Sequence, residues 1–443
     1  MADSPAKVET FGIEHIPDGA RHGSPNRTFT LWFAANLTIA DYVIGVLSTT
    51  VFGLRVAEAV PVLVLGNLLG GLFLGLSAAM GPKLGFPQMF SSRASFGAKG
   101  NYPLGAFNWV STVGWFTVNT ILGTEAVQAV FPSANFALVA TLMVLVQVAV
   151  AVYGHDFIQL FERVMSAVLG LLFLFVFLLT LPHLGQVLGP STALYPTTAS
   201  LGTLAAVFAI SFSYIMSWSP YASDYSRYLP ASTSGRRVAL YALAGGGLAS
   251  LAVEVIGALV GATNGISTIG GLYTFAGGFG WVAMLAIVLG GMAANALNIY
   301  TNALSALVLD VRARRATMVV VGGVAGLLLS LLGGATFESF FENFLLVLDY
   351  WITPWLAIIL VDFYVVRRTS VAATAGARRY DFSALGIYAL SVLISVPFMV
   401  PPTSPGFPVG ALSGWFGGAD FSYFVSFGIA AVLTYAVRRR KRA

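Results

Sequence analysis

Residues 211–225, SFSYIMSWSPYASDY, decide the fold of this chain. They follow the apolar run 201–210, so hydroxyls, an indole, a proline and a carboxylate appear before a helix has crossed a bilayer. Pro220 has no N–H and clashes with the preceding turn, so carbonyls near Met216 lose their helical partners. Such groups are tolerated at membrane depth only where they are buried in protein or line a cavity. We predict a discontinuous membrane helix with a binding site at its break. The alternative is a proline-kinked helix packed in a bundle without a ligand.

The composition is that of a polytopic membrane protein. Of the 443 residues, 57% are apolar and only 9% are charged, whereas soluble domains carry about 25% charged residues. The lack of cysteine excludes a disulfide framework, and residues 1–28 have no apolar core of the kind found in a cleavable signal. The net charge of +5 does not indicate nucleic-acid binding, because the basic residues concentrate at one membrane face.

The apolar runs predict an all-α membrane protein with twelve transmembrane helices. Residues 1–28 would form a cytoplasmic segment, 29–366 the transporter core, 382–437 two accessory helices, and 438–443 a basic cytoplasmic tail. The predicted spans are 29–51, 60–80, 103–130, 136–153, 160–181, 203–226, 237–261, 281–309, 316–334, 340–366, 382–400 and 421–437.

The basic residues predict the orientation of these spans. Every Lys and Arg except Arg55 falls in the N-terminal segment, in or within a few residues of a loop after an even-numbered span, or in the tail. By the positive-inside rule this face is cytoplasmic, so both termini would lie inside a plasma-membrane protein. The glycine- and proline-rich stretch 81–100 would be a cytoplasmic connector, and the basic tail an anchor at anionic lipid.

Span one carries a second polar interruption, because Asn36 and Asp41 lie inside it. A carboxylate within the bilayer is by default a functional candidate, although Asp41 could instead cap a broken helix. Spans one and six lie five spans apart, and matching breaks in two halves indicate a transporter site between inverted repeats. The repeats would be residues 29–181 and 203–366.

Span three places polar groups on both sides of an indole. Thr112 precedes Trp115 by about one turn, and Trp115 and Asn119 are i and i+4 on one helix face. Such a column suits a planar heteroaromatic ligand, since the indole can stack on the ring and the carboxamide can bond its edge. The alternative is a tryptophan packed among helices with the amide bonded across the bundle.

Span eight adds two amides on one face, Asn295 and Asn298, after a run of small residues that allows close helix approach. Three more acidic residues, Glu125, Glu254 and Asp349, lie within predicted spans. Each could relay protons or pair with a neighbouring hydroxyl.

Several motifs follow one another along nearly the whole chain. They are Gly12-Ile13-Glu14 with Ile16-Pro17, Trp32 with Asn36 and Gly45, Gly85-Phe86-Pro87-Gln88 to Arg93 and Phe96-Gly97, Gly114-Trp115 with Asn119, Trp218 with Tyr221, Asp224-Tyr225, Tyr228 and Pro230, and Asn298-Ile299-Tyr300. In this order they resemble the nucleobase:cation symporter-1 family, specifically its purine–cytosine permease branch.

The resemblance implies a five-plus-five inverted repeat of the LeuT type, with two extra C-terminal helices, and cation-driven uptake of a purine or pyrimidine base. It implies that Trp115 stacks on the base and Asn119 hydrogen-bonds it, while Trp218 covers the other face and Asn298 contacts the ring edge. Ser217 and Asn295 complete the predicted substrate site, together with Thr112.

The chain departs from the family pattern at three positions. Related members can have Gln at the position of Thr112, and eukaryotic members tend to have Asn and Pro where this chain has Ala294 and Leu297. The cargo therefore stays open between cytosine or a purine and a related heterocycle, such as allantoin, a hydantoin, a vitamin-like base or a nucleoside.

The coupling ion is predicted from the oxygen atoms that spans one and eight could provide as ligands. Sodium-coupled relatives have two hydroxyls in span eight at places that fall here near Met292 and Ala293, neither of which has a side-chain oxygen. Backbone carbonyls near Asn36 would make a poor sodium site on their own. A proton carried by Asp41 is therefore favoured over Na⁺.

The sequence argues against two other classes of membrane protein, a channel and an intramembrane enzyme. A channel would show a ring-like polar filter or a repeated pore motif, and neither is visible. An intramembrane enzyme needs paired carboxylates or histidine clusters within spans, whereas the four histidines lie in predicted loops or termini. We therefore predict no catalytic residue, cofactor or metal.

Overall fold

The computed structural model describes residues 8–187, 199–264, 269–333, 337–367, 369–400 and 410–440. Within these ranges every regular element is a helix. Lys7, Arg368, Lys441 and Arg442, which contributed to the predicted orientation, lie outside the described residues.

Each predicted span coincides with a helix or, in spans one and six, with an interrupted one. The first half contains α1 (Asn26–Ala35), α2 (Ile39–Thr50), α3 (Val56–Ala78), α7 (Tyr102–Val130), α8 (Phe136–Tyr153) and α9 (His155–Thr180). The second half contains α11 (Leu201–Met216), α12 (Ala222–Ser226), α13 (Gly235–Asn264), α15 (Gly280–Val308), α16 (Arg315–Gly333) and α17 (Phe337–Leu360). The chain continues into α19 (Phe382–Ser395) and α20 (Ser422–Arg440).

Eight helices of the described part are long and apolar enough to cross a membrane, or up to nine if the bent pair α1 and α2 is one span. These helices have the length and composition that the sequence predicts for membrane spans.

Both predicted interruptions are present. α1 and α2 meet at a bend of 59°, and Thr38 caps α2 by accepting a hydrogen bond from the backbone N–H of Asp41. α11 ends at Met216, and Pro220 lies in a short 3-10 turn, Ser219–Tyr221, before α12. Proline therefore ends the long helix four residues before its own position, as expected from the backbone partner that it removes.

The connector 81–100 was predicted as a loop, but it contains three short helices, α4 (Gly81–Leu84), α5 (Gln88–Ser91) and α6 (Arg93–Phe96). Gln88 is buried, and its backbone N–H donates to Oδ1 of Asp224 at 2.8 Å. These helices were not predicted because each is only four residues long and depends on tertiary packing rather than on its own pattern: α4 and α5 pack against the end of span six, and α6 packs against α18 (Val371–Ala375) and α19.

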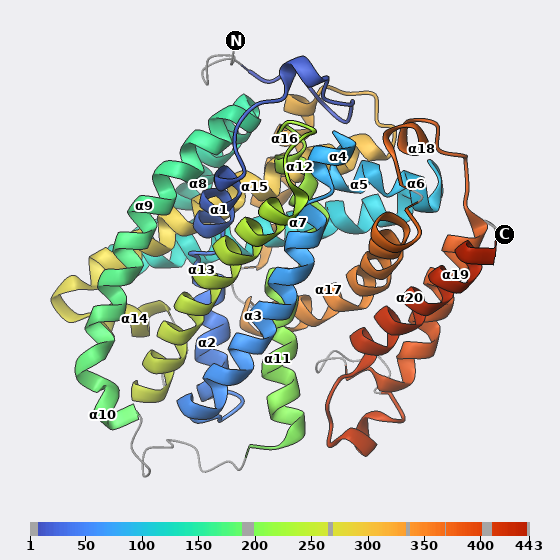
Figure 1. Ribbon diagram of the computed structural model, residues 1–443. Coiled ribbons are helices and arrows are strands. Elements are labelled where there is room, and N and C mark those ends of the chain that lie inside the picture. The colour runs from blue at the N-terminus through green and yellow to red at the C-terminus, as the bar shows by residue number, and fades with distance from the viewer. Residues whose placement is uncertain are drawn as a thin grey trace.

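The two halves of the core are interleaved (Figure 1). α15 packs along α7, α13 packs against α2 and α3, α3 packs against α11, and α16 packs against α8. The contact of α2 with α13 depends on Gly45 and Gly257, since a Cβ at Gly45 would lie 1.9 Å from the backbone oxygen of Glu254. α19 and α20 lie together at one edge, where α20 contacts α17 (Figure 1).

The loops predicted to share one membrane face lie together at one end of the bundle, with the N-terminal segment across them (Figure 1). Side chains from distant parts of the chain join there. The contacts are Arg21 Nη1 to Pro82 O at 2.8 Å, Arg93 to Asp310 at 2.8 Å, Arg227 and Arg315 to Glu9 at 3.7 and 3.6 Å, and Arg438 to Asp381 at 2.8 Å.

Candidate functional site

Trp218 connects the two helix breaks. Its indole Nε1 donates to Oδ1 of Asn36 at 3.0 Å, while Nδ2 of Asn36 donates to the carbonyl of Trp32 at 2.7 Å. The indole also makes edge-to-face contacts with Trp32, at a ring separation of 5.5 Å, and with Tyr221, at 5.1 Å. The break in span six thus holds its tryptophan against the break in span one.

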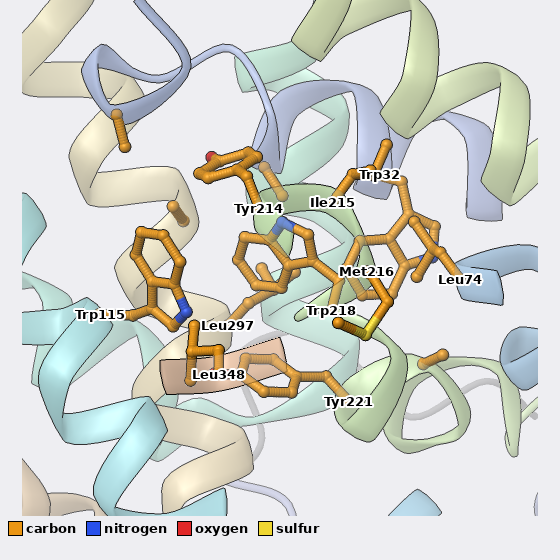
Figure 2. Packing of buried hydrophobic residues seen from close by; sticks show 14 of the residues in the cluster. Trp32, Leu74, Trp115, Tyr214, Ile215, Met216, Trp218, Tyr221, Leu297 and Leu348 are labelled. Carbon is orange, nitrogen blue, oxygen red and sulfur yellow. The ribbon is translucent and has the colours of Figure 1, made fainter. Parts of the chain in front are cut away.

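Trp115 lies in the same buried cluster, and both indoles are only 5% exposed. Its ring meets the rings of Tyr214 and Phe344 edge-to-face at 5.3 and 5.2 Å. Figure 2 shows the two indoles within one group of side chains, with Tyr214, Leu297 and Leu348 beside them. Each indole therefore has its own aromatic supports, and the insertion of a flat ring between the two stays a prediction.

Ser217 does not point a free hydroxyl at either indole. Its Oγ donates to the backbone carbonyl of Tyr214 at 2.6 Å. The side chain thus satisfies a carbonyl in the last turn of α11, which is the usual way to relieve a backbone group freed at a helix end.

Three amides on α7 and α15 form one network. Asn119 and Asn298 both donate from Nδ2 to Oδ1 of Asn295, at 3.2 and 3.1 Å. Asn295 in turn donates from Nδ2 to the carbonyl of Phe116 at 3.0 Å and to Oε1 of Gln147 at 3.3 Å. The structure therefore brings together three of the predicted substrate residues, with Asn295 in the middle.

Backbone carbonyls fix which way these amides point. A carbonyl accepts only hydrogen, so the bond from Asn295 to Phe116 O places Nδ2 of Asn295 there and leaves its Oδ1 as an acceptor. Asn119 also donates to a backbone carbonyl, that of Trp115, at 3.1 Å. The remaining atoms, Oδ1 of Asn119 and Oδ1 of Asn298, are buried and have no hydrogen-bond partner among the described residues. The network thus leaves two acceptor oxygens without donors.

Thr112 belongs to a different contact. Its Oγ1 donates to the carbonyl of Trp109 at 2.8 Å and accepts from Nδ2 of Asn302 at 2.8 Å. Asn302 lies two turns after Asn295, and spacing alone could have found it, since it shares the polar face of span eight. The structure therefore joins Thr112 to α15 below the amide network rather than within it.

Asp41 is fully buried at the start of α2. Thr38 Oγ1 donates to its Oδ2 at 3.2 Å, and Ser250 of α13 donates to its Oδ1. Asn36 does not take part, since its amide is committed to Trp218 and Trp32. The two residues predicted for the coupling ion therefore occupy separate environments.

The stretch of α15 around Met292 and Ala293, which sequence analysis considered for a coupling ion, packs closely against the α1–α2 break. A Cβ at Gly290 of α15 would lie 2.2 Å from the carbonyl oxygen of Leu37 in the α1–α2 break. Met292 and Ala293 bring no side-chain oxygen to this contact. In the described part of the chain, no group of three or more His, Cys, Asp or Glu side chains could hold a metal ion.

Glu9, which no sequence pattern singled out, is the centre of a polar cluster at the end of the bundle. Glu9 accepts hydrogen bonds from the hydroxyls of Tyr228 and Tyr300 and from the backbone N–H of His155, besides its ion pairs with Arg227 and Arg315. Burial of the Arg227 guanidinium opposes its positive charge and would lower its pKa. The pKa of Arg227 is nevertheless held above its ordinary value by the neighbouring Tyr228, Tyr300 and Glu9. The N-terminal segment is thereby fastened over the ends of α9, α12, α15 and α16.

Solved structures share this fold. Mhp1, a nucleobase-cation-symport-1 family transporter solved in a closed conformation with bromovinylhydantoin bound, matches with a TM-score of 0.78 and 18% identity over 99% of this chain and 96% of that one. A Na⁺-coupled sialic acid symporter matches with a TM-score of 0.62 and 10% identity over 96% of this chain and 91% of that one.

Sequence comparison identifies the family. A family profile described as "Permease for cytosine/purines, uracil, thiamine, allantoin" matches residues 15–426. YxlA of Bacillus subtilis (strain 168), named as a purine-cytosine permease, is 30% identical over 465 aligned positions that cover 99% of this chain and 98% of YxlA. The purine-cytosine permease fcyB of Emericella nidulans is 26% identical over 96% of this chain and 87% of its own. The chain is thus a membrane permease rather than an enzyme, and it belongs to the nucleobase:cation symporter-1 family, in its purine–cytosine permease branch.

Proposed function

We propose that the protein is a secondary active transporter that imports a nucleobase, cytosine or a purine, together with a proton, by alternating access. The family match and the named purine–cytosine permeases support the cargo class. The observation that carries the proposal is the buried group of two indoles, beside which two amide oxygens have no donor among the residues that the structure describes. Such a site matches a flat ring with hydrogen-bonding edges.

The architecture proposed for this cycle is twelve spans, with spans one to five and six to ten related as inverted repeats and both termini cytoplasmic in the plasma membrane. The helix breaks at α1–α2 and α11–α12 support it, because they fall in corresponding spans of the two halves. The contacts of α13 with α3, α15 with α7 and α16 with α8 support it too, since each joins corresponding spans.

The acceptor oxygens narrow the class of base. Oδ1 of Asn119 and Oδ1 of Asn298 can bond only a hydrogen-bond donor, so they favour a base that presents an amine or a ring N–H. Cytosine and adenine each present both. Leaving a buried acceptor unpaired costs about 1–3 kcal/mol, so an analogue without the amine should bind roughly 5- to 150-fold more weakly.

Stacking would supply most of the remaining affinity. A base between Trp115 and Trp218 gains about 1–3 kcal/mol from aromatic stacking, by analogy with nucleic-acid platforms. Once the base is bound, the four-helix bundle formed by spans one, two, six and seven would rock against the rest of the core. The Glu9 cluster would open on the inward side, because it joins the N-terminal segment to helices of both groups.

A proton is the proposed coupling ion, with Asp41 as its carrier. Two observations support it, namely the full burial of the Asp41 carboxyl between Thr38 and Ser250 and the absence of side-chain oxygens at Met292 and Ala293. Sodium coupling is the alternative, as is a related heterocycle as cargo, and both are outcomes of the experiment below.

The test is counterflow of labelled cytosine in proteoliposomes, with competition by matched pairs of bases. We expect cytosine to compete far better than pyrimidin-2-one, and adenine far better than purine, because the second member of each pair lacks the amine. Asn298→Leu should reduce this preference. Absence of counterflow with every base and with the related heterocycles would overturn the transport proposal. Equal competition within each pair would overturn the proposal that the two amide oxygens select a base with an amine. Uptake that follows the sodium gradient at clamped pH would show that sodium, rather than a proton, is the coupling ion.

A further inference from the structure

A second buried carboxyl lies close to Asp41. Glu254 is 0% exposed and is on α13, one helical turn after Ser250, whose hydroxyl donates to Asp41. Ser250 is also within hydrogen-bonding reach of the Glu254 carboxyl. Gly45 and Gly257 allow α2 and α13 to touch at this level, since a Cβ at Gly257 would lie 2.1 Å from the carbonyl oxygen of Tyr42. One hydroxyl thus stands between two carboxyls from different helices.

The hydrogen bonds that Glu254 accepts from Asn67 and Ser211 both fall on one of its two carboxyl oxygens, Oε2. Its Oε2 accepts from Nδ2 of Asn67 on α3 and from Oγ of Ser211 on α11, the latter at 3.0 Å. Its Oε1 is buried and has no partner among the residues that the structure describes, and the same is true of Oδ1 of Asn67. A carboxylate would leave that oxygen unsatisfied, whereas a carboxylic acid would place a proton there and become a donor.

The charges around the two carboxyls also indicate that one of them is protonated. Over the described ranges, neither Asp41 nor Glu254 forms an ion pair with a Lys, Arg or His side chain. The groups that face the pair are Thr38 on the α1–α2 break, Asn67 on α3, Ser211 and Tyr214 on α11, and Ser250 on α13 itself. Two carboxylates without a cation in such a place cannot both stay ionised, so the pair keeps at least one proton.

We propose, on the basis of the transport function above, that Glu254 is the proton donor to Asp41 and that the Ser250 hydroxyl relays the proton between them. The protonated Glu254 carboxyl gives its proton to Oγ of Ser250 as the hydroxyl proton of Ser250 passes to Oδ1 of Asp41. The hydroxyl is regenerated, Glu254 becomes the carboxylate, and a proton from the outer side restores it. α13 begins at the end of the bundle with the basic loops, so Glu254 lies nearer the opposite, proposed outer end than Ser250 does.

The relay ends at the base site. The hydroxyl of Tyr214 bonds Oγ1 of Thr38 at 2.9 Å, and Thr38 donates onward to Asp41. The ring of Tyr214 lies edge-on to Trp115 at 5.3 Å. Neutralising Asp41 removes the charge that aligns Thr38 and Tyr214. The protonation state of the pair therefore acts on the indole that would hold the base.

The test compares two assays on Glu254→Gln proteoliposomes. Counterflow of labelled cytosine needs no net proton movement, whereas accumulation driven by a pH gradient does. When one proton moves with each neutral base at zero membrane potential, a gradient of one pH unit sustains roughly tenfold accumulation. We expect Glu254→Gln to keep counterflow but to lose this accumulation and the base-dependent acidification of the lumen. The matched control is Glu162→Gln, which neutralises a fully buried carboxyl on α9 outside the pair and should retain both.

The outcomes separate this inference from the proposed function. Proton-driven accumulation that persists in Glu254→Gln, or that is lost equally in Glu162→Gln, overturns the relay and leaves transport standing. Wild-type protein without counterflow overturns the transport function itself. If Glu254→Gln loses counterflow too, Ser250 decides the question. Ser250→Ala should then lose proton-driven accumulation, whereas Ser250→Thr, which keeps the hydroxyl, should retain it. Equal accumulation in these two variants would contradict the relay.

Discussion

The indole N–H of Trp218 donates a hydrogen bond to the side-chain oxygen of Asn36 across 3.0 Å, joining the break of span six to the break of span one. A broken helix exposes backbone groups that the bilayer cannot satisfy. Here the Asn36 side chain satisfies one of them at the Trp32 carbonyl and positions the indole with its other end. The bond thus fixes both the local backbone and the orientation of a ring in the proposed site.

This bond can be measured by a double-mutant cycle. Asn36→Ala and Trp218→Phe each remove it, and a neutral hydrogen bond is worth about 1 kcal/mol net, so each should weaken base binding roughly fivefold. Because the two substitutions remove the same hydrogen bond, the double variant should bind the base only slightly more weakly than either single variant. Binding of labelled cytosine to purified protein measures all three. Effects that add would show that the two residues act separately.

The close contact of α2 with α13 predicts a severe effect of a single methyl group. Gly45→Ala places a Cβ 1.9 Å from the backbone oxygen of Glu254, so the helices must separate, at a cost of about 1–3 kcal/mol. The melting temperature in detergent should fall. Gly386→Ala in α19 is the control, since nothing lies within 4 Å of its Cβ and alanine is the better helix former. A Gly45→Ala protein as stable as that control would contradict the packing.

His22 predicts a pH dependence of stability. Its Nε2 bonds Oδ1 of Asp156 at 2.7 Å, and this bond raises the pKa of His22 above its ordinary value of 6.5. The folded protein therefore holds the proton more tightly than the unfolded chain. The stabilisation is fully present below about pH 6.5 and is lost as the pH rises through the raised pKa. The melting temperature of the wild type should exceed that of His22→Gln at mildly acidic pH and converge with it at alkaline pH. A constant difference would contradict this, and His183→Gln controls for the loss of an imidazole.

The Glu9 cluster predicts how the inward side opens. Glu9→Gln removes the charge that pairs with Arg227 and Arg315, so the inward-open form should become more populated. The chain contains no cysteine, so Ser305→Cys, at a buried position on α15, can report opening through its rate of reaction with a thiol reagent added on the inner side. We expect labelling to become several-fold faster with Glu9→Gln. Glu14→Gln, at an exposed position of the same segment, should leave it unchanged, and an equal rate in both variants would refute the role of Glu9.

The sequence was informative where a residue type conflicts with its surroundings. Pro220 and Asp41 are out of place in apolar runs, so both helix breaks could be predicted, and Trp115, Asn119 and Asn298 stood out in the same way. Contacts between distant residues were not accessible. Glu9 lies in a polar segment where glutamate is ordinary, and only the fold brings it to Arg227 and Arg315.

Small polar residues were missed for a related reason. Ser250 and Asn67 are common in helices that pack closely, and nothing in their own neighbourhoods points to the carboxyls that they contact. The orientation of the amides was also hidden, because it depends on the backbone carbonyls of Trp115 and Phe116.

The most direct measurement of the central claim is binding of labelled cytosine or adenine to purified Trp115→Ala and Trp218→Ala, compared with Trp415→Ala, whose indole is 82% exposed. If the two buried indoles hold the base, each of the first two variants should lose roughly 5- to 150-fold in affinity, given about 1–3 kcal/mol per stacked base, while Trp415→Ala binds as the wild type does. Unchanged affinity in Trp115→Ala, with the protein folded, would contradict the account.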